Sequence, residues 1–265
     1  MTMYESPVTL WFVSGEDAAA VLSEEPRADR GFGRKYLAQL NPSWPVTPIG
    51  QFPFNRSAPA SRGEFYIAAF PGVALVHTIV EDASRLSRLD PALLGSIPAR
   101  DVYAISAGEG DFGAFAHWHR GELQRSLGAR REELFEDIGL PESFEGPYWA
   151  GERAEQPGGI ALPFVPADLA REAQRSWLGV DVSPEGPDIQ VAGFAIDGRP
   201  EAKVDAPSGV RMSMAEWASD AASKLGLTPG GNQYDDYERR KEGDEFARLA
   251  EGITRRVRSW WPFRR

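Results

Sequence analysis

The chain has 265 residues, with 29 basic and 39 acidic side chains, a formal net charge of −10 and no cysteine. The absence of cysteine excludes a disulfide framework, a thiolate zinc site, a cysteine nucleophile and an iron–sulfur cluster. The acidic balance argues against a nucleic-acid-binding protein, because neutralising phosphates requires a cationic face. The length fits one large domain with appendages, or two small domains.

The N-terminal segment has none of the features of a secretory signal, which needs a basic start and about 7–15 apolar residues. Here the first seven residues contain Glu5 and no Lys or Arg, and the apolar run at 8–13 is short. No stretch of the sequence approaches the roughly 18 apolar residues of a membrane span. These patterns predict a cytoplasmic protein without a transmembrane segment.

The first quarter of the chain predicts one buried strand, one short helix and a long connection. Residues 8–13 form the strand, and a helix at 18–22 follows acidic residues that suit its positive end. The segment 41–54 is rich in proline, which removes backbone donors and favours extended structure, so we expect it to wrap the surface. The side chains expected to anchor it are Trp44, Phe52 and Phe54.

The middle of the chain is rich in short apolar runs typical of strands. The pairs Pro71-Gly72 and Arg120-Gly121 predict turns, the second a tight hairpin in which glycine supplies a positive φ. Consecutive strands joined by short links favour an antiparallel sheet. The expected strands are 65–70, 73–80, 102–107 and 112–119, and the last continues through the hairpin into 122–127.

The last third predicts a helix at about 167–178, a half-buried strand at 189–196 and a helical C-terminal extension. The fold class is therefore α+β: a mostly antiparallel sheet, Pro-rich wrapping loops, a few packed helices and the extension. We expect an α+β domain at 1–204 and the extension at 205–265. Within the extension, apolar spacing predicts helices at 213–225 and 234–260.

Several motifs, in this order, resemble a mainly actinobacterial family of uncharacterised proteins. The resemblance covers about residues 8–198 and begins with the first strand and its Gly15-Glu16-Asp17 turn. It carries no activity, cofactor or catalytic residue that could be transferred to this chain. The further motifs are LNPSWPV at 40–46, AFPGV at 69–73, FGAFA at 112–116 with its hairpin to Leu127, EDIG at 136–139 and FEGPYWAGE at 144–152.

The best candidate metal ligands are His117 and His119. Alternate residues of a strand point to the same face, so the two imidazoles would lie side by side, a spacing that suits Zn²⁺ or a similar ion. The alternative is that both histidines lie on an exposed or edge face with Trp118 in the core. We assign no cofactor. The candidates for a third ligand are Glu109, Asp111 and His77.

A second candidate site combines carboxylates with aromatic side chains, a combination that glycoside hydrolysis also uses. We expect a groove in this region, because loops carry sites and large aromatic side chains are costly to expose. The alternative is a solvated acidic loop that its aromatic residues anchor to the core. The candidate groove residues are Glu136, Asp137, Glu145, Tyr148 and Trp149.

The C-terminal end differs sharply in charge from the rest of the chain. The last eleven residues contain five arginines and no acid, so they carry +5 while residues 1–254 carry −15. Arginines beside indoles suit a membrane interface with anionic lipid, docking on the chain's own acidic body, or a partner's acidic surface; nucleic acid fits less well. The candidate interaction residues are Arg255, Arg256, Arg258, Trp260, Trp261 and Phe263.

These patterns favour a non-enzymatic cytoplasmic binding or scaffold protein whose tail docks on a partner or on the inner membrane face. The alternative is a hydrolase-like enzyme that uses the face of His117 and His119 with nearby carboxylates, with or without a metal. The sequence has no G-x-S-x-G elbow and no phosphate-binding loop between a strand and a helix, so neither of those enzyme classes is indicated.

Overall fold

The computed structural model describes residues 4–57, 60–107, 110–153 and 161–201. Within these residues the chain forms a nine-stranded sheet in the order β2-β9-β3-β4-β1-β5-β6-β7-β8, and every neighbouring pair is antiparallel. The strands are β1 (Ser6–Val13), β2 (Thr47–Pro53), β3 (Glu64–Phe70), β4 (Val73–Val80), β5 (Asp101–Ala107), β6 (Gly113–His119), β7 (Glu122–Arg130), β8 (Glu133–Gly139) and β9 (Gln190–Ala195).

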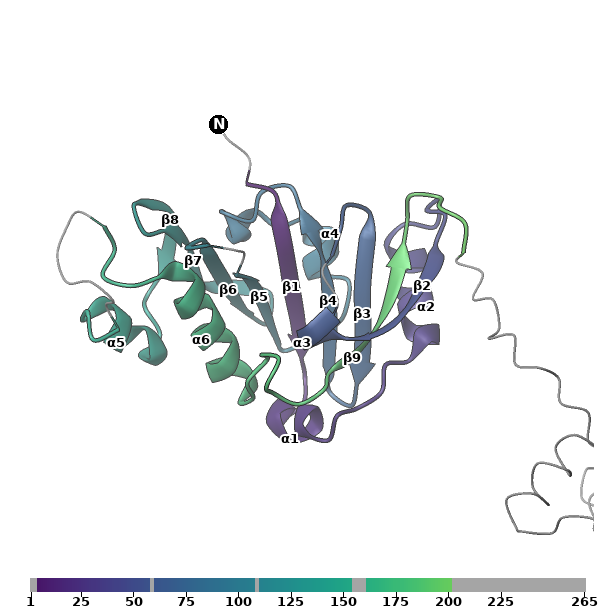
Figure 1. The fold of residues 1–265 in the computed structure, drawn as a ribbon, viewed down its shortest axis with the longest axis horizontal. Coiled ribbons are helices and arrows are strands. Elements are labelled where there is room, and N and C mark those ends of the chain that lie inside the picture. Colours follow the sequence, from purple (N-terminus) through teal and green to yellow (C-terminus); the bar gives the residue numbers. More distant parts are fainter. Residues whose placement is uncertain (1–3, 58–59, 108–109, 154–160, 202–265) are drawn as a thin grey trace, which may run out of the picture. The chain divides into compact units, whose positions relative to one another are not determined.

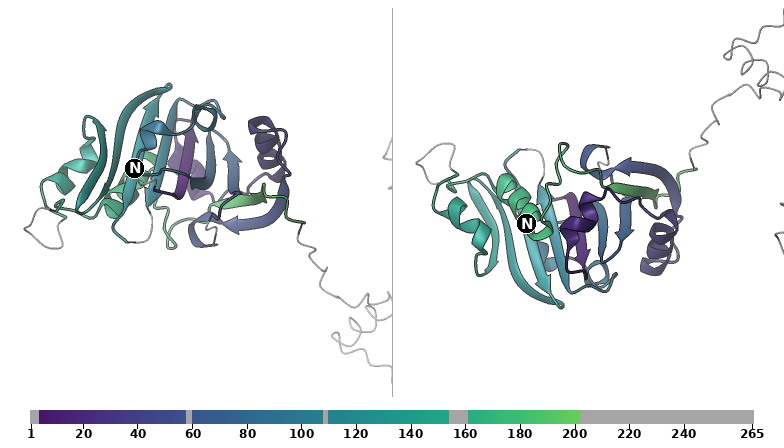
Figure 2. Two further views of the ribbon diagram at one scale, coloured as in Figure 1. Left: turned by 90° about the horizontal axis from the view of Figure 1, so that it is seen from above. Right: turned by 90° about the horizontal axis from the view of Figure 1, so that it is seen from below.

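Short helices lie on both faces of the sheet (Figures 1 and 2). Helix α6 packs on β5, β6 and β7, and we call this side the α6 face; helix α2 packs against β3 and β9 on the opposite side. The bounds are α1 (Ala18–Ser23), α2 (Arg30–Leu40), α3 (Phe54–Ser57), α4 (Pro91–Leu94), α5 (Gly146–Trp149) and α6 (Pro166–Leu178), with 3₁₀ turns η1 (Leu86–Arg88) and η2 (Ser143–Glu145).

Strand β1 lies at the centre of the sheet and is buried on both faces. Val8, Leu10 and Phe12 face the α2 side, while Thr9 and Trp11 face the α6 side, and all five are buried. A central strand that is covered on both faces is expected to be apolar on both faces, with no polar alternation. Residues 8–13 follow this pattern apart from Thr9. The apolar run at 8–13 therefore marks the middle of the core.

The hairpin between β6 and β7 forms as the sequence predicts. Arg120 has φ 51° and Gly121 has φ 84°, and two successive positive φ values are typical of a type I′ turn. This turn matches the right-handed twist of the two strands and holds them in register. Beyond the turn His119 pairs with Glu122 and Trp118 with Leu123, and the register then shifts between Trp118 and His117.

Helix α6 also forms where the sequence predicts it. It begins at Pro166, whose missing N–H costs nothing at the first helical position, and Gly179 ends it with a left-handed φ of 70°. Its buried side includes Leu169 and Ala173. Because it crosses β5 and β6, it brings Trp177 over the strand that carries the histidines.

The antiparallel α+β class is confirmed, and two of the sequence expectations need correction. The Pro-rich segment does not only wrap the surface, because residues 47–53 form the edge strand β2, where proline is tolerated. Residues 133–139 form the opposite edge strand β8, which rules out an acidic loop there. The predicted helices at 213–225 and 234–260, and the extension to which they belong, lie outside the described residues.

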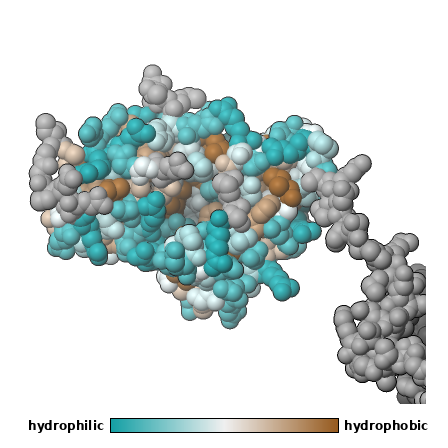
Figure 3. All heavy atoms as spheres, viewed as in Figure 1, coloured by the Kyte–Doolittle hydropathy of each residue, from teal (hydrophilic) through white to brown (hydrophobic). Residues whose placement is uncertain are grey.

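The face of the molecule drawn in Figure 3 is mostly polar. On the face in Figure 3, hydrophilic residues predominate and apolar side chains form small, separate spots. None of the helices in the described part of the chain is both long enough and apolar enough to cross a bilayer.

Candidate metal-binding site

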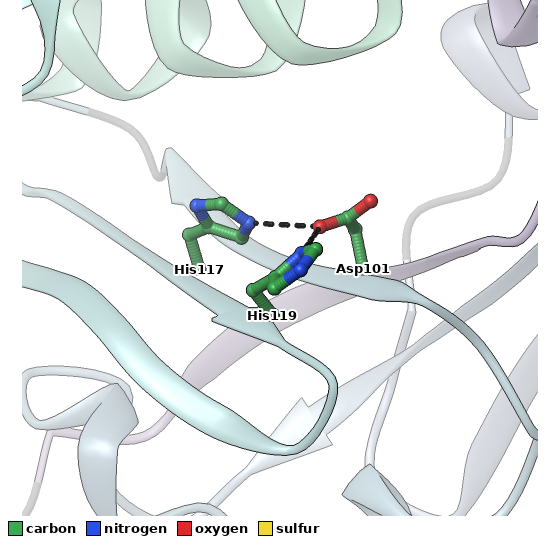
Figure 4. Close-up of side chains that lie close together, drawn as sticks. All are labelled: Asp101, His117 and His119. Atoms are coloured by element: carbon green, nitrogen blue, oxygen red, sulfur yellow. Dashed lines mark hydrogen bonds and ion pairs between the residues drawn. The ribbon is translucent and has the colours of Figure 1, made fainter. Parts of the chain in front are cut away.

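Strands β5 and β6 bring two histidines and an aspartate together on the α6 face (Figure 4). Asp101 is the cross-strand partner of His119, and His117 lies two residues back on the same side of β6. Both imidazoles point at one carboxylate oxygen: Asp101 Oδ1 lies 2.7 Å from His119 Nδ1 and 3.3 Å from His117 Nε2. The arrangement follows directly from strand alternation and register.

The three side chains offer one nitrogen, one nitrogen and one oxygen, and these atoms all lie within 4.8 Å of one another. Two imidazoles and a carboxylate are a ligand set that suits Zn²⁺ and other divalent transition ions. Hydrogen bonds join Asp101 to both histidines, and a cation bound between the three side chains would replace the protons of those hydrogen bonds. The donor set therefore fits a divalent metal ion.

Two of the three side chains, His117 and Asp101, also form a hydrogen bond with a residue outside the cluster. Glu142 Oε1 accepts a hydrogen bond from His117 Nδ1 at 3.1 Å, and Glu142 Oε2 accepts one from Trp177 Nε1 at 2.8 Å. On the other side, Arg100 Nε donates to Asp101 Oδ2 at 2.8 Å. A carboxylate behind a histidine fixes the ring orientation and makes the free nitrogen a better ligand, as in many metal sites.

Aromatic rings form the wall beside His117. The Tyr103 and Trp177 rings stack with centroids 4.7 Å apart and an interplanar angle of 12°, and the His117 ring lies 4.9 Å from Tyr103. His119, by contrast, has 43% of its side chain exposed. The cluster is therefore packed on one side and open to solvent on the other.

The pKa shifts reflect this environment. Burial tends to raise the pKa of Asp101, but hydrogen bonds from Arg100, His119 and His117 outweigh burial and lower the pKa to about 2. Burial tends to lower the pKa of His117, but Glu142 and Asp101 raise it above its ordinary value. Burial, with Asp101 and Glu142 adding to it, raises the pKa of Tyr103 to about 12. Asp101 is thus an anion at neutral pH, which is the form in which a carboxylate binds a metal ion.

His117 and His119 lie side by side, as strand alternation predicts. The acid that bridges them is Asp101, which is not among the predicted third ligands. His77 hydrogen-bonds Thr9 elsewhere on the sheet, and Asp111 accepts from the Arg131 backbone N–H. Glu109 lies outside the described residues. Asp101 was missed because its position depends on the pairing of β5 with β6. The glycines at positions 108 and 110, which are typical of a turn between paired strands, were the available sequence signal for that pairing.

The predicted groove residues do not share one groove. Glu136 faces the α2 side, where it accepts hydrogen bonds from Ser87 and Ser126. Asp137 and Glu145 lie on the α6 side, and both bind the guanidinium of Arg125. The expectation of one carboxylate groove is therefore wrong, because neighbouring residues of β8 point to opposite faces.

Of the other two groove residues, Trp149 supports the Arg125 ion pair and Tyr148 packs in the core. Trp149 Nε1 donates to Glu145 Oε2 at 3.1 Å, and Tyr148 is buried edge-on against Phe164. Arg125 and Glu145 are themselves fully buried and joined by two hydrogen bonds of 2.8 Å. Arg125 is not among the predicted site residues, because nothing in its local sequence pattern distinguishes it from a surface arginine.

The fold and the cluster define an antiparallel α+β domain with a two-histidine, one-aspartate constellation on one sheet face. The chain belongs to a family of unknown function, DUF6928, whose model matches residues 7–194. The resemblance drawn from the motifs is confirmed, and the expectation that the family is mainly actinobacterial stays a prediction. No curated protein and no solved structure matches the chain. The candidate interaction residues of the tail lie outside the described residues.

Proposed function

We propose that this domain binds a divalent transition-metal ion, with Zn²⁺ as the first candidate, through Asp101, His117 and His119. The observation that carries the proposal is the convergence of three ligand atoms within 4.8 Å of one another. Glu142 and Arg100 behind two of the ligands support it, because an accidental surface cluster has no need of such partners.

The ligand set also supports the hydrolase-like alternative as a second candidate. Three protein ligands with a position left for water are typical of catalytic rather than structural zinc sites, and a bound Zn²⁺ makes that water acidic enough to attack a substrate. The exposed side of His119 is where that position would face. In this chain Glu142 and Trp177 would keep His117 oriented, and Arg100 would keep Asp101 charged.

Replacing His117 with Ala is expected to weaken Zn²⁺ binding by more than about 100-fold, since it removes a ligand, and Asp101→Asn should have a similar effect. Glu142→Gln leaves all ligands in place but removes the carboxylate behind His117, so a loss of about 10–100-fold is expected. The measurements are titration calorimetry with Zn²⁺ on the full chain and the visible absorption of bound Co²⁺.

The matched control is His77→Gln, because His77 is the chain's one histidine outside the cluster. It should leave Zn²⁺ affinity and the Co²⁺ spectrum unchanged. Retention of binding in both His117→Ala and Asp101→Asn would place the metal elsewhere and overturn the proposal. Loss of binding in His77→Gln to the same extent would do so too.

We also propose that the C-terminal tail docks this cytoplasmic protein on an anionic surface, with the inner membrane face as the first candidate and an acidic protein partner as the other. The charge separation supports this proposal: −15 on residues 1–254 against +5 on the last eleven. Basic residues near an anionic membrane contribute about 1 kcal/mol each, so five arginines are sufficient for weak, salt-sensitive attachment.

Deletion of residues 255–265 is expected to abolish co-sedimentation with vesicles of mixed phosphatidylglycerol and phosphatidylcholine, and to leave the melting temperature within a few degrees of the full chain. High salt should release the full chain, because the attraction is electrostatic. Phosphatidylcholine vesicles are the control. Equal sedimentation of both chains would contradict a lipid-binding tail, and failure of the shortened chain to fold would show that the tail is structural.

A further inference from the structure

A cavity of about 440 Å³ opens on the α6 face between helices α3 and α6. Its floor comes from strands β1, β4 and β5, and its walls come from the two helices and the segment that follows α6. Volumes in this range are typical of sites for small organic molecules. Among the residues that line it are Thr9, Asn55, Arg56, His77, Ile105 and Arg171.

The cavity is separate from the metal-binding cluster. Alternate residues of β5 share one face, so Asp101, Tyr103 and Ile105 follow one another along it. Ile105 lines the cavity and lies four residues, or about 13 Å, from Asp101. Tyr103, stacked on Trp177, stands between them. None of the three cluster residues lines the cavity, so ligand binding in the cavity does not rest on the proposed metal function.

The floor holds a neutral histidine. Thr9 Oγ1 and His77 Nδ1 share a hydrogen bond of 2.9 Å, and the ring meets Phe54 edge-on at 5.1 Å. Burial lowers the pKa of His77 to about 4, so the ring is uncharged at neutral pH. Among the described residues nothing hydrogen-bonds Nε2. The cavity floor therefore offers one polar atom without a partner.

Hydrogen bonds fix the Asn55 side chain in the cavity wall. The Asn55 amide nitrogen donates to the carbonyl oxygens of Ser183 at 2.7 Å and Pro187 at 3.2 Å, which fixes the side chain. Its Oδ1 is buried and has no hydrogen-bond partner in the described structure. Because that oxygen is shielded from solvent, Asn55 shapes the cavity wall and does not offer its Oδ1 to a ligand.

The charged side chains that line the cavity are both cationic. Arg56 and Arg171 are among its lining residues and no acidic side chain is, although the chain as a whole is acidic. Each arginine is about half exposed and pairs with a carboxylate outside the cavity, Arg56 with Asp188 and Arg171 with Asp168. Exposed pairs of this kind are weak, so an incoming anion can compete for either guanidinium.

We propose that this cavity binds a small organic anion with an apolar body. The acidic group of the ligand pairs with Arg171 and Arg56 at the rim. The apolar body lies against Phe54 and Ile105. The remaining lining is mixed, with two prolines, a valine and an alanine beside Thr9, Gln174 and Ser183. His77 Nε2 meets a polar group of the ligand inside.

Three probes separate the parts of this proposal, all applied to the full chain. The first is 8-anilinonaphthalene-1-sulfonate, which has an apolar body and an anionic group. The second, N-phenyl-1-naphthylamine, has the same rings without the sulfonate, and the third, inorganic phosphate, has the charge without the rings. We expect the sulfonate to bind one per chain and about tenfold more tightly than the neutral amine. Phosphate should not displace it.

Helix α6 provides a matched pair of variants. Arg171 and Arg175 are one turn apart, 54% and 53% exposed, and each pairs with the carboxylate three residues before it. Arg171 lines the cavity and Arg175 does not. Arg171→Gln should weaken binding of the sulfonate about fivefold and leave binding of the neutral amine unchanged. Arg175→Gln should change neither.

Three results would overturn the proposal. Equal affinity for the sulfonate and the neutral amine would show that the charge has no role. Equal effects of Arg171→Gln and Arg175→Gln would show that the probe binds through general surface charge. Displacement of the sulfonate by phosphate would reduce the cavity to a simple anion site.

Discussion

Arg125→Met is expected to lower the free energy of unfolding by about 3–5 kcal/mol, because it leaves the Glu145 carboxylate buried without its cation. Both side chains are fully buried, and the guanidinium makes two hydrogen bonds of 2.8 Å to Glu145 and a third to Asp137. Burial tends to lower the pKa of Arg125, but these two carboxylates raise it above its ordinary value. Arg125 therefore remains a cation although its side chain is fully buried.

Urea unfolding of the full chain at neutral pH measures this effect, and a double variant supplies its control. Gln at position 145 is neutral and keeps an oxygen that can accept from the Glu142 backbone N–H, as Glu145 Oε1 does at 2.9 Å. Arg125→Met with Glu145→Gln should therefore be more stable than Arg125→Met alone. A loss below about 1 kcal/mol in the single variant would contradict the assignment of a buried, mutually dependent pair.

The buried pair also reaches the metal-binding cluster. Glu145 accepts the backbone N–H of Glu142 and so fixes the turn from which the Glu142 side chain meets His117. Trp177, from helix α6, holds the other oxygen of Glu142. The orientation of His117 thus depends on β7, η2 and α6 at once. Glu145, one of the predicted groove residues, belongs to this support. It holds Glu142 in position behind His117 and does not line a groove.

The central strands could be predicted from the sequence because their signals are local. Runs such as 8–13 and 73–80 are apolar on both faces, and Arg120-Gly121 specifies its own turn. Strand β8 was missed because it has acids on both faces, at Glu136 and Asp137. These acids form hydrogen bonds with serines and with Arg125, which lie on other segments of the chain. Such partners cannot be identified until the fold is known.

Helix α2 was missed for a related reason. Its sequence contains Gly31 and Gly33, which weaken a helix, so local propensity argues against it. At Gly33 an added Cβ would lie 2.3 Å from the Phe194 ring, which shows that the close packing on β9 requires glycine. Tertiary packing thus overrides propensity here. Likewise, His117 and His119 follow from alternation within one strand, whereas Asp101 needs the register between two.

Between pH 7 and pH 4.5 the protein is expected to lose up to about 3 kcal/mol of stability through His77 alone. Burial lowers the folded-state pKa of this histidine to about 4, from the ordinary value of 6.5. Between those two values the unfolded chain binds more protons than the folded one, so stability falls as the pH falls. The contribution is fully present above pH 6.5 and is lost by pH 4.

The groups around His77 make this interpretation direct. Thr9 and Phe54 contact it, Tyr66 lies 6.3 Å away, and the charged residues lining its cavity are Arg56 and Arg171, which repel a proton. No acidic side chain lines the cavity to stabilise the charged ring. Protonation therefore places a cation beside two others in a partly apolar cavity, which is unfavourable for the folded state.

The test compares the full chain with His77→Gln by urea unfolding at pH 7 and at pH 4.5. Glutamine is neutral at both pH values and keeps a polar group near Thr9, so it removes the titration without removing the hydrogen-bonding capacity. All other titrating groups contribute alike to both chains and cancel in the difference. The variant should lose about 2–3 kcal/mol less than the full chain on acidification. Parallel losses would show that His77 is protonated as easily when folded as when unfolded, and that the cavity floor is open to water.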